Sequence, residues 1–193
     1  MKEIEKLQRR LKDMVPAGVY EHSLRVQQRC VELASHYGVD TNSAAIAGLL
    51  HDVAKRHSAD ELIYLAEQDD LPITELVLTE PVAALHGVVG AAIIGREFGV
   101  TDREVLLAVQ QHALGGEEMS ALSKILYLAD KTEAERTAPE IEAVRALCAQ
   151  NLDEALVAAF DMMIRTKLNE RSLILEQLVR SRNKAVLKLR RSD

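Results

Sequence analysis

In the stretch IAGLLHDVAK, residues 46–55, an apolar run stops abruptly at two adjacent polar side chains, His51 and Asp52. A carboxylate buried in apolar surroundings costs several kcal/mol unless it is paired, so this placement needs a physical reason. A divalent cation supplies one, because it accepts a carboxylate oxygen and an imidazole nitrogen together and keeps both groups deprotonated. The alternative is that His51 ends a helix and Asp52 begins a turn. The pair by itself does not separate these two interpretations.

The composition favours an all-α protein. The chain has 193 residues, of which 48% are hydrophobic and only 3% aromatic, with no Trp, four Pro and nine Gly. Helices packed through Leu, Ala, Val and Ile are typical of such a composition, and an all-β fold is not. The length suits one domain over residues 1–193, with enough residues for a sizeable core.

Cysteine use and the N-terminal residues bear on where the protein acts. Cys30 and Cys148 are far apart and lack CxxC spacing, so we expect reduced core thiols rather than a disulfide. The first six residues mix charges and form no apolar segment, and no apolar run approaches the length of a membrane span. We therefore expect a cytoplasmic protein that has no membrane partner.

The net charge of -6 hides a basic C-terminal segment. Between residues 180 and 191 every charged side chain is basic: Arg180, Arg182, Lys184, Lys188, Arg190 and Arg191. Such a tail binds nucleic acid or anionic lipid in some proteins. More often it is a solvated helix end, because the helix macrodipole favours cations there. We prefer the second interpretation and do not expect nucleic acid as a partner.

Helical periodicity runs through nearly every segment and predicts a bundle of about eight to ten helices. Gly38 and Gly99 are expected to end helices, and the segments 58–61 and 101–104 are expected to be capping boxes. The predicted helices cover residues 2–14, 19–37, 41–53, a stretch from 58, 82–98, 101–112, a stretch from 120 past 130, 139–150, and a long C-terminal helix over 153–189.

Four more side chains, each on another predicted helix, share the ligand chemistry of His51 and Asp52: His22, His86, His112 and Asp130. Side chains from several helices converge in the core of a bundle, which is where such folds build metal sites. Six ligands are enough for two ions. Imidazole together with carboxylate suits iron, manganese or zinc, whereas magnesium prefers a site richer in oxygen.

Two neighbouring cations suit the hydrolysis of a phosphate bond. They lower the pKa of a bridging water and clamp the attacking and leaving oxygens of the phosphate. Asp52 is the expected bridging ligand, since its two oxygens can contact both ions. The expected nucleophile is therefore a metal-bridging hydroxide rather than a side chain.

The order His22, His51-Asp52, Asp130 resembles the H…HD…D arrangement of the HD-domain phosphohydrolases, which are all-helical metalloenzymes. The segments YEHSLRV (20–26), AGLLHDVAK (47–55), LHG (85–87) and MSALSKILYLAD (119–130) narrow the resemblance to the YqeK-type HD proteins of bacteria. The similarity covers about residues 17–165 and implies an HD-domain core over that range. It also implies symmetrical hydrolysis of diadenosine tetraphosphate to two ADP at a di-iron centre.

The resemblance also implies a role for each of these side chains. One metal is expected to be held by His22, His51, Asp52 and Asp130, and the second by His86 and His112 with Asp52 shared. Asp52 and Lys55 are the expected catalytic residues. Lys55, three residues after Asp52, is expected to reach a phosphate oxygen.

Further side chains are candidates for substrate binding. Arg136 fits the family's Asp-x-x-Glu-x-x-Arg pattern, and a guanidinium fork suits a non-reacting phosphate. Glu133 is expected to orient Arg136 or a metal-bound water. Arg25 shares the helix face of His22, and His57 is either a phosphate contact at the mouth of the site or a solvent-exposed side chain. Ala113 and Ala134 depart from the Thr and Pro of the family pattern, and neither change removes a ligand.

Two other functions stay open from the sequence. One is an HD-domain nucleotidase or phosphodiesterase that acts on another nucleotide. The other is a metal-stabilised module that binds RNA or the ribosome through the basic C-terminal segment, with vestigial hydrolysis. The presence of all six proposed ligands argues against vestigial chemistry. The sequence is also compatible with a homodimer.

Overall fold

A computed structural model describes residues 2–191, and within them eleven α-helices and one 3-10 helix form the fold. The elements are α1 (Lys2–Met14), α2 (Ala17–Tyr37), α3 (Thr41–Leu50), η1 (Val53–Arg56), α4 (Ala59–Gln68), α5 (Glu75–Thr79), α6 (Pro81–Phe98), α7 (Arg103–Gln111), α8 (Ala121–Thr132), α9 (Pro139–Cys148), α10 (Leu152–Asn169) and α11 (Glu176–Leu189). No strand occurs in the described part of the chain, which confirms the all-α prediction.

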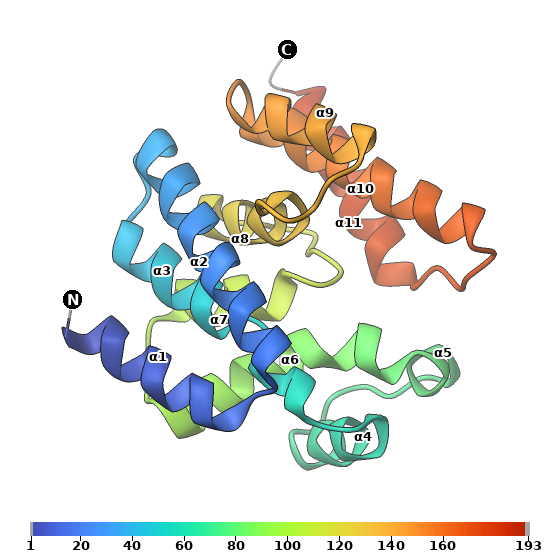
Figure 1. The fold of residues 1–193 in the computed structure, drawn as a ribbon. Helices are drawn as coiled ribbons and strands as arrows, with labels where there is room; N and C mark the ends of the chain where they lie inside the picture. Colours follow the sequence, from blue (N-terminus) through green and yellow to red (C-terminus); the bar gives the residue numbers. More distant parts are fainter. Residues whose placement is uncertain (1, 192–193) are drawn as a thin grey trace.

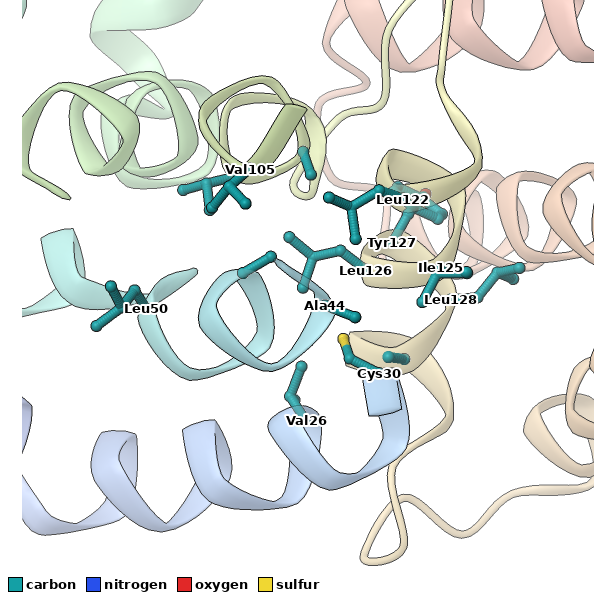
Figure 2. Close-up of a cluster of buried hydrophobic side chains, with 14 of the residues drawn as sticks. Val26, Cys30, Ala44, Leu50, Val105, Leu122, Ile125, Leu126, Tyr127 and Leu128 are labelled. Carbon is teal, nitrogen blue, oxygen red and sulfur yellow. The ribbon is translucent and has the colours of Figure 1, made fainter. Parts of the chain in front are cut away.

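Helices α2, α3, α6, α7 and α8 form the middle of the molecule, with α4 and α5 on one side and α9 to α11 on the other (Figure 1). A continuous set of buried apolar side chains links these groups, from Leu7 on α1 to Leu178 on α11. Figure 2 shows its central part, where Val26 and Cys30 of α2 face Ala44 of α3 and Leu126 of α8. This core holds the ends of the central helices in fixed positions.

Helices α2 and α3 approach each other closely because Gly48 has no side chain. A Cβ at Gly48 would lie 2.8 Å from the Cα of Gln27, which is a clash with backbone. The Gly48 carbonyl also accepts a hydrogen bond from Nδ1 of His51 at 2.8 Å. Gly48 therefore allows the close contact between α2 and α3 and also provides the carbonyl that orients the His51 ring.

Most predicted helix ends agree with the structure. Gly38 and Gly99 end α2 and α6 with φ of 67° and 69°, a left-handed conformation that glycine adopts without strain. Ser58 and Glu61 form the predicted capping box of α4, and Ser120 caps α8. Among the described residues, none of the helices combines the length and apolar character needed to cross a bilayer.

The prediction of a capping box over 101–104 is wrong in detail. Helix α7 begins at Arg103, and its N-cap is Asp102, whose carboxylate accepts a hydrogen bond from the Glu104 amide. The Asp102 carboxylate also accepts a hydrogen bond from the Ser43 hydroxyl of α3. A short helix, α5, occupies part of the interval where no helix was expected, and together with a break in the predicted C-terminal helix it brings the count of α-helices to eleven, above the predicted range.

The predicted long C-terminal helix over 153–189 is also wrong, because the chain breaks between α10 and α11. Arg171, in the connection that follows α10, has a φ of 53°, a left-handed conformation that does not continue a helix. Helix α11 then packs back against α10 and buries Leu178 and Ser181. A single straight helix would leave these residues exposed, so burial of the apolar face outweighs helix continuity.

We expect Gly48→Ala to destabilise the protein by about 1–3 kcal/mol, because the added methyl group forces α2 and α3 apart. Gly18→Ala is the matched control, since a Cβ at Gly18 would meet nothing within 4 Å. It should be neutral or stabilise by about 0.5–1 kcal/mol. Urea denaturation of both variants measures the difference, and equal stabilities would contradict the packing argument.

Candidate metal centre

The structure brings all six predicted ligand residues together in the middle of the bundle. They come from five different helices or helix ends: His22 from α2, His51 and Asp52 from the junction of α3 and η1, His86 from α6, His112 from the end of α7, and Asp130 from α8. His51 is completely buried, and His86, the most exposed of the remaining buried members, is only 8% exposed. His22 is slightly more accessible, with 14% of its side chain exposed.

The carboxylate of Asp52 lies between two pairs of imidazoles. Its Oδ2 is 3.2 Å from Nε2 of His51 and 3.7 Å from Nε2 of His22. Its Oδ1 is 3.4 Å from Nε2 of His112 and 3.8 Å from Nε2 of His86. Each oxygen of one carboxylate therefore faces a different histidine pair.

Asp130 completes the group around His22 and His51. Its Oδ1 is 3.1 Å from Nε2 of His22 and 3.9 Å from Nε2 of His51. Two sets of three residues place their ligand atoms within 4.8 Å of one another: His22 with His51 and Asp130, and His51 with Asp52 and His112. Such distances are short enough for the side chains of each set to share one ion.

Backbone carbonyls orient three of the four imidazoles. Nδ1 of His51 and Nδ1 of His112 lie 2.8 Å and 2.7 Å from the carbonyl oxygens of Gly48 and Val109. His86 makes the same contact with the carbonyl of Val82. A carbonyl only accepts hydrogen bonds, so each Nδ1 carries the proton and each Nε2 presents a lone pair to the centre. This is the arrangement of histidines that bind a metal through Nε2.

Several of these inward-facing atoms lack partners among the described residues. Nε2 of His51 and Oδ1 of Asp52 are buried and make no hydrogen bond within that part of the chain. Nε2 of His86 lies 3.0 Å from Nε2 of His112, although both rings use their proton on a carbonyl. Lone pairs that converge in a buried space repel each other unless positive charge lies between them. The donor set therefore fits a divalent cation.

The pKa shifts agree with ligands in their deprotonated forms. Burial, with the neighbouring His112, lowers the pKa of His86 to about 3. Burial likewise lowers the pKa of His112. Burial alone would raise the pKa of Asp52, but the neighbouring His51 and His112 hold it well below its usual value. Both imidazoles are thus neutral and the carboxylate is ionised near neutral pH.

His51 differs from these two histidines. Burial acts to lower its pKa, but the carboxylates of Asp52 and Asp130 outweigh burial and raise it. The His51 side of the centre therefore favours a positive charge, which either a proton or a metal ion can supply.

Two of the predicted substrate-binding side chains contact acidic residues of this centre. Nζ of Lys55 lies 2.8 Å from Oδ2 of Asp52, and its side chain is 37% exposed. Nη2 of Arg136 lies 3.4 Å from Oδ1 of Asp130, with 43% of the side chain exposed. Both basic side chains therefore lie at the boundary between the buried ligand residues and solvent. His57 is instead paired with Arg56 and Glu61.

Arg25 and Glu133 lie behind His22. Nδ1 of His22 is 3.5 Å from Oε1 of Glu133, and Glu133 Oε2 accepts a hydrogen bond from Arg25 Nε at 2.9 Å. Glu133 is only 3% exposed. Its carboxylate thus faces His22 in the place where the other three histidines meet a backbone carbonyl.

Lys131 belongs to this centre, although sequence reasoning assigned it no role. Its Nζ donates to Oδ2 of Asp130 at 2.6 Å and to the His112 carbonyl at 3.1 Å, and it lies 4.5 Å from the centre of the Tyr127 ring. Lys131 thus links Asp130, which lies beside His22 and His51, to His112, which lies beside His86. A lysine in the last turn of a helix is ordinarily a solvated cation, so no sequence pattern distinguishes Lys131.

The basic residues of α11 are largely engaged with acidic side chains. Arg182 Nε lies 2.8 Å from Asp161 Oδ1, and Lys184 Nζ lies 3.4 Å from Glu117 Oε2. Arg180 pairs with Glu176 one turn earlier in the same helix. These pairs neutralise part of the positive charge on which the RNA-binding alternative depends.

Similarity to known proteins shows which protein family has this site. The model of the HD domain family matches residues 19–135, so the chain belongs to the HD domain family. More particularly, it is 36% identical over 142 residues to "Bis(5'-nucleosyl)-tetraphosphatase, symmetrical" of Staphylococcus aureus, covering 74% of this chain and 72% of that protein. The protein of the same name from Bacillus subtilis is 33% identical over 72% of this chain and 73% of its own length. These similarities confirm the resemblance to the YqeK-type HD proteins.

A solved structure has the same fold. It is a predicted HD superfamily hydrolase involved in NAD metabolism from Clostridium acetobutylicum, with a TM-score of 0.90 and 29% sequence identity. The superposition covers 95% of this chain and 97% of that one. The likeness therefore includes α9, α10 and α11 as well as the helices that carry the six clustered residues.

We expect Mn²⁺ at about 100 times its dissociation constant to raise the melting temperature of chelator-treated protein by roughly 5–10 °C, because binding to the native state stabilises it. His51→Gln should abolish most of this shift, while His36→Gln, a change at an exposed histidine of α2, should preserve it. Differential scanning calorimetry with and without EDTA provides the measurement. A His51→Gln variant that responds like the native protein would show that the ion binds elsewhere.

Proposed function

We propose that this protein hydrolyses diadenosine tetraphosphate symmetrically and releases two molecules of ADP. The observation that carries the proposal is the Asp52 carboxylate, whose two oxygens face two separate histidine pairs. A centre of that form suits two adjacent cations acting on one phosphate. The names of the Staphylococcus and Bacillus relatives supply the substrate class.

In this proposal one cation is held by His22, His51, Asp52 and Asp130, and the other by His86 and His112 with Asp52 shared. The imidazole and carboxylate ligands suit iron, manganese or zinc, and the family resemblance favours iron. Two such ions, when bound, activate a water and neutralise charge on the phosphate under attack. Asp52 is the residue on which both halves of the centre depend.

The protein's own side chains have separable tasks. Lys55, which is partly exposed and 2.8 Å from Asp52, is placed to bind an oxygen of the phosphate under attack. Arg136, at 3.4 Å from Asp130, is placed to bind a phosphate further along the chain through its planar guanidinium group. Glu133 accepts a hydrogen bond from Arg25 and orients His22. Two basic side chains beside the centre suit a substrate with several phosphates in a row.

Product analysis tests the proposal directly. Incubation of metal-loaded protein with diadenosine tetraphosphate should yield ADP as the only nucleotide product, identified by ion-exchange chromatography. ATP and AMP in equal amounts would indicate asymmetrical cleavage. If dinucleoside tetraphosphate stays intact while another nucleotide is hydrolysed, the alternative of a different HD-domain nucleotidase or phosphodiesterase takes its place.

Two substitutions test the assignment of the ligands. Asp52→Ala should abolish turnover and remove both ions, because each half of the centre loses a ligand and a negative charge. His86→Ala should reduce the metal content from two ions to one, because His86 belongs only to the second set. Metal analysis by inductively coupled plasma mass spectrometry, with His36→Ala as the control, gives the stoichiometry. Two ions per chain in His86→Ala, or full activity in Asp52→Ala, would refute the assignment.

A further inference from the structure

Arg145, on α9, binds the backbone of the segment that follows α8. Its Nε donates to the Thr132 carbonyl at 3.1 Å, and its Nη2 donates to the carbonyls of Glu133 and Arg136, each at 3.0 Å. Glu142, one turn earlier on α9, pairs with Nη1. One guanidinium group therefore holds three carbonyl groups of residues 132–136.

These carbonyls lie at and just beyond the C-terminal end of α8, where the last backbone acceptors of a helix have no partner within it. The chain leaves the helix at Glu133 and forms a tight turn, closed by a hydrogen bond from the Arg136 amide to the Glu133 carbonyl at 3.1 Å. Arg145 binds both ends of this turn. The turn is thereby fixed to α9 as well as to α8.

The turn carries two side chains that face the candidate metal centre. Glu133 is buried, lies 3.5 Å from Nδ1 of His22 and accepts hydrogen bonds from Arg25 and from the Glu135 amide. Arg136 reaches Asp130 from the other end of the turn. The backbone position of the turn therefore decides where both side chains stand relative to the centre.

We propose that Arg145 is a positioning residue for the site. By fixing the 132–136 turn, it places Glu133 against His22 and Arg136 at the mouth of the centre. The inference rests on the proposed function for the role of Arg136, while the effect on His22 depends only on metal binding. Arg145 lies outside the set of six clustered residues, so its influence reaches the centre through the turn.

The geometry requires arginine rather than a generic cation. Arginine has five donors in a rigid planar fork, and here two nitrogens of the fork serve three carbonyls in different directions. A lysine has its donors at a single point and cannot serve the Thr132 carbonyl and the two carbonyls of the turn together. Arg145→Lys therefore keeps the charge but loosens the turn.

Kinetics and metal affinity of Arg145→Met and Arg145→Lys test the proposal. Substitution of a residue that supports the metal ligands without binding the metal itself typically lowers metal affinity or activity by 10- to 100-fold. We expect kcat/KM for diadenosine tetraphosphate to fall by about 10-fold or more in Arg145→Met, mainly through a higher KM because Arg136 binds a non-reacting phosphate. Mn²⁺ affinity, measured by isothermal titration calorimetry, should fall as well. Arg145→Lys should show smaller changes in the same direction.

A double-mutant cycle separates positioning from general stability. In an Arg136→Met background, Arg145→Met should raise KM much less than it does in the native protein, since the two residues act through one turn. Arg165→Met, at an exposed arginine of α10, is the matched control and should leave KM and Mn²⁺ affinity unchanged. Effects on KM that multiply fully in the double variant would overturn the proposal.

Two further outcomes are decisive. If Arg145→Met does not fold, Arg145→Lys decides the question, and native values of KM and Mn²⁺ affinity in that variant would overturn the proposal. If the native protein does not turn over diadenosine tetraphosphate, the proposed function fails. Mn²⁺ affinity of Arg145→Lys then still tests whether Arg145 positions Glu133 against His22.

Discussion

The Asp52 carboxylate is the constraint on which the rest of the structure depends. It is 1% exposed, yet it is ionised, and four imidazole nitrogens lie within 3.8 Å of its two oxygens. A buried anion is tolerated only where compensating charge and hydrogen bonds surround it. Lys55 supplies a direct ion pair, and the histidines of four central helices surround the carboxylate with nitrogens that can share a cation with it. The packing of the central helices thus encloses one charged group, the Asp52 carboxylate.

Close backbone contacts make this convergence feasible. Gly48 lets α3 lie against α2, and Gly87 lets α6 lie against the end of α7, where a Cβ would come within 2.9 Å of the Gln110 carbonyl oxygen. His51 and His112 stand directly after the last residues of α3 and α7, and each donates Nδ1 to a carbonyl three residues earlier. The ring orientation therefore follows from the helix that precedes each histidine, and the separation of the rings follows from the glycines.

Residues around the centre differed in how well sequence reasoning identified them. His51 and Asp52 were recognisable because polar groups at the end of an apolar run contradict ordinary burial. Lys131 and Arg145 were not, because each belongs to a helix on which a basic residue near the C-terminal end is unremarkable. Lys131 meets the His112 carbonyl only after α7 and α8 pack together, and Arg145 meets the carbonyls of 132–136 only after α8 and α9 pack together. Contacts with backbone carbonyls leave no pattern of residue types in a sequence.

The sequence by itself determined the helical class, many helix ends and the chemical types of the clustered side chains. Periodicity, capping residues and glycines act through residues that are close in the sequence, so local backbone preferences are enough to predict helices and their ends. Only the tertiary structure decided that each Asp52 oxygen faces its own histidine pair, and that the C-terminal segment folds back as α10 and α11. Both outcomes depend on packing between segments distant in sequence, where burial of apolar and charged groups outweighs local preference.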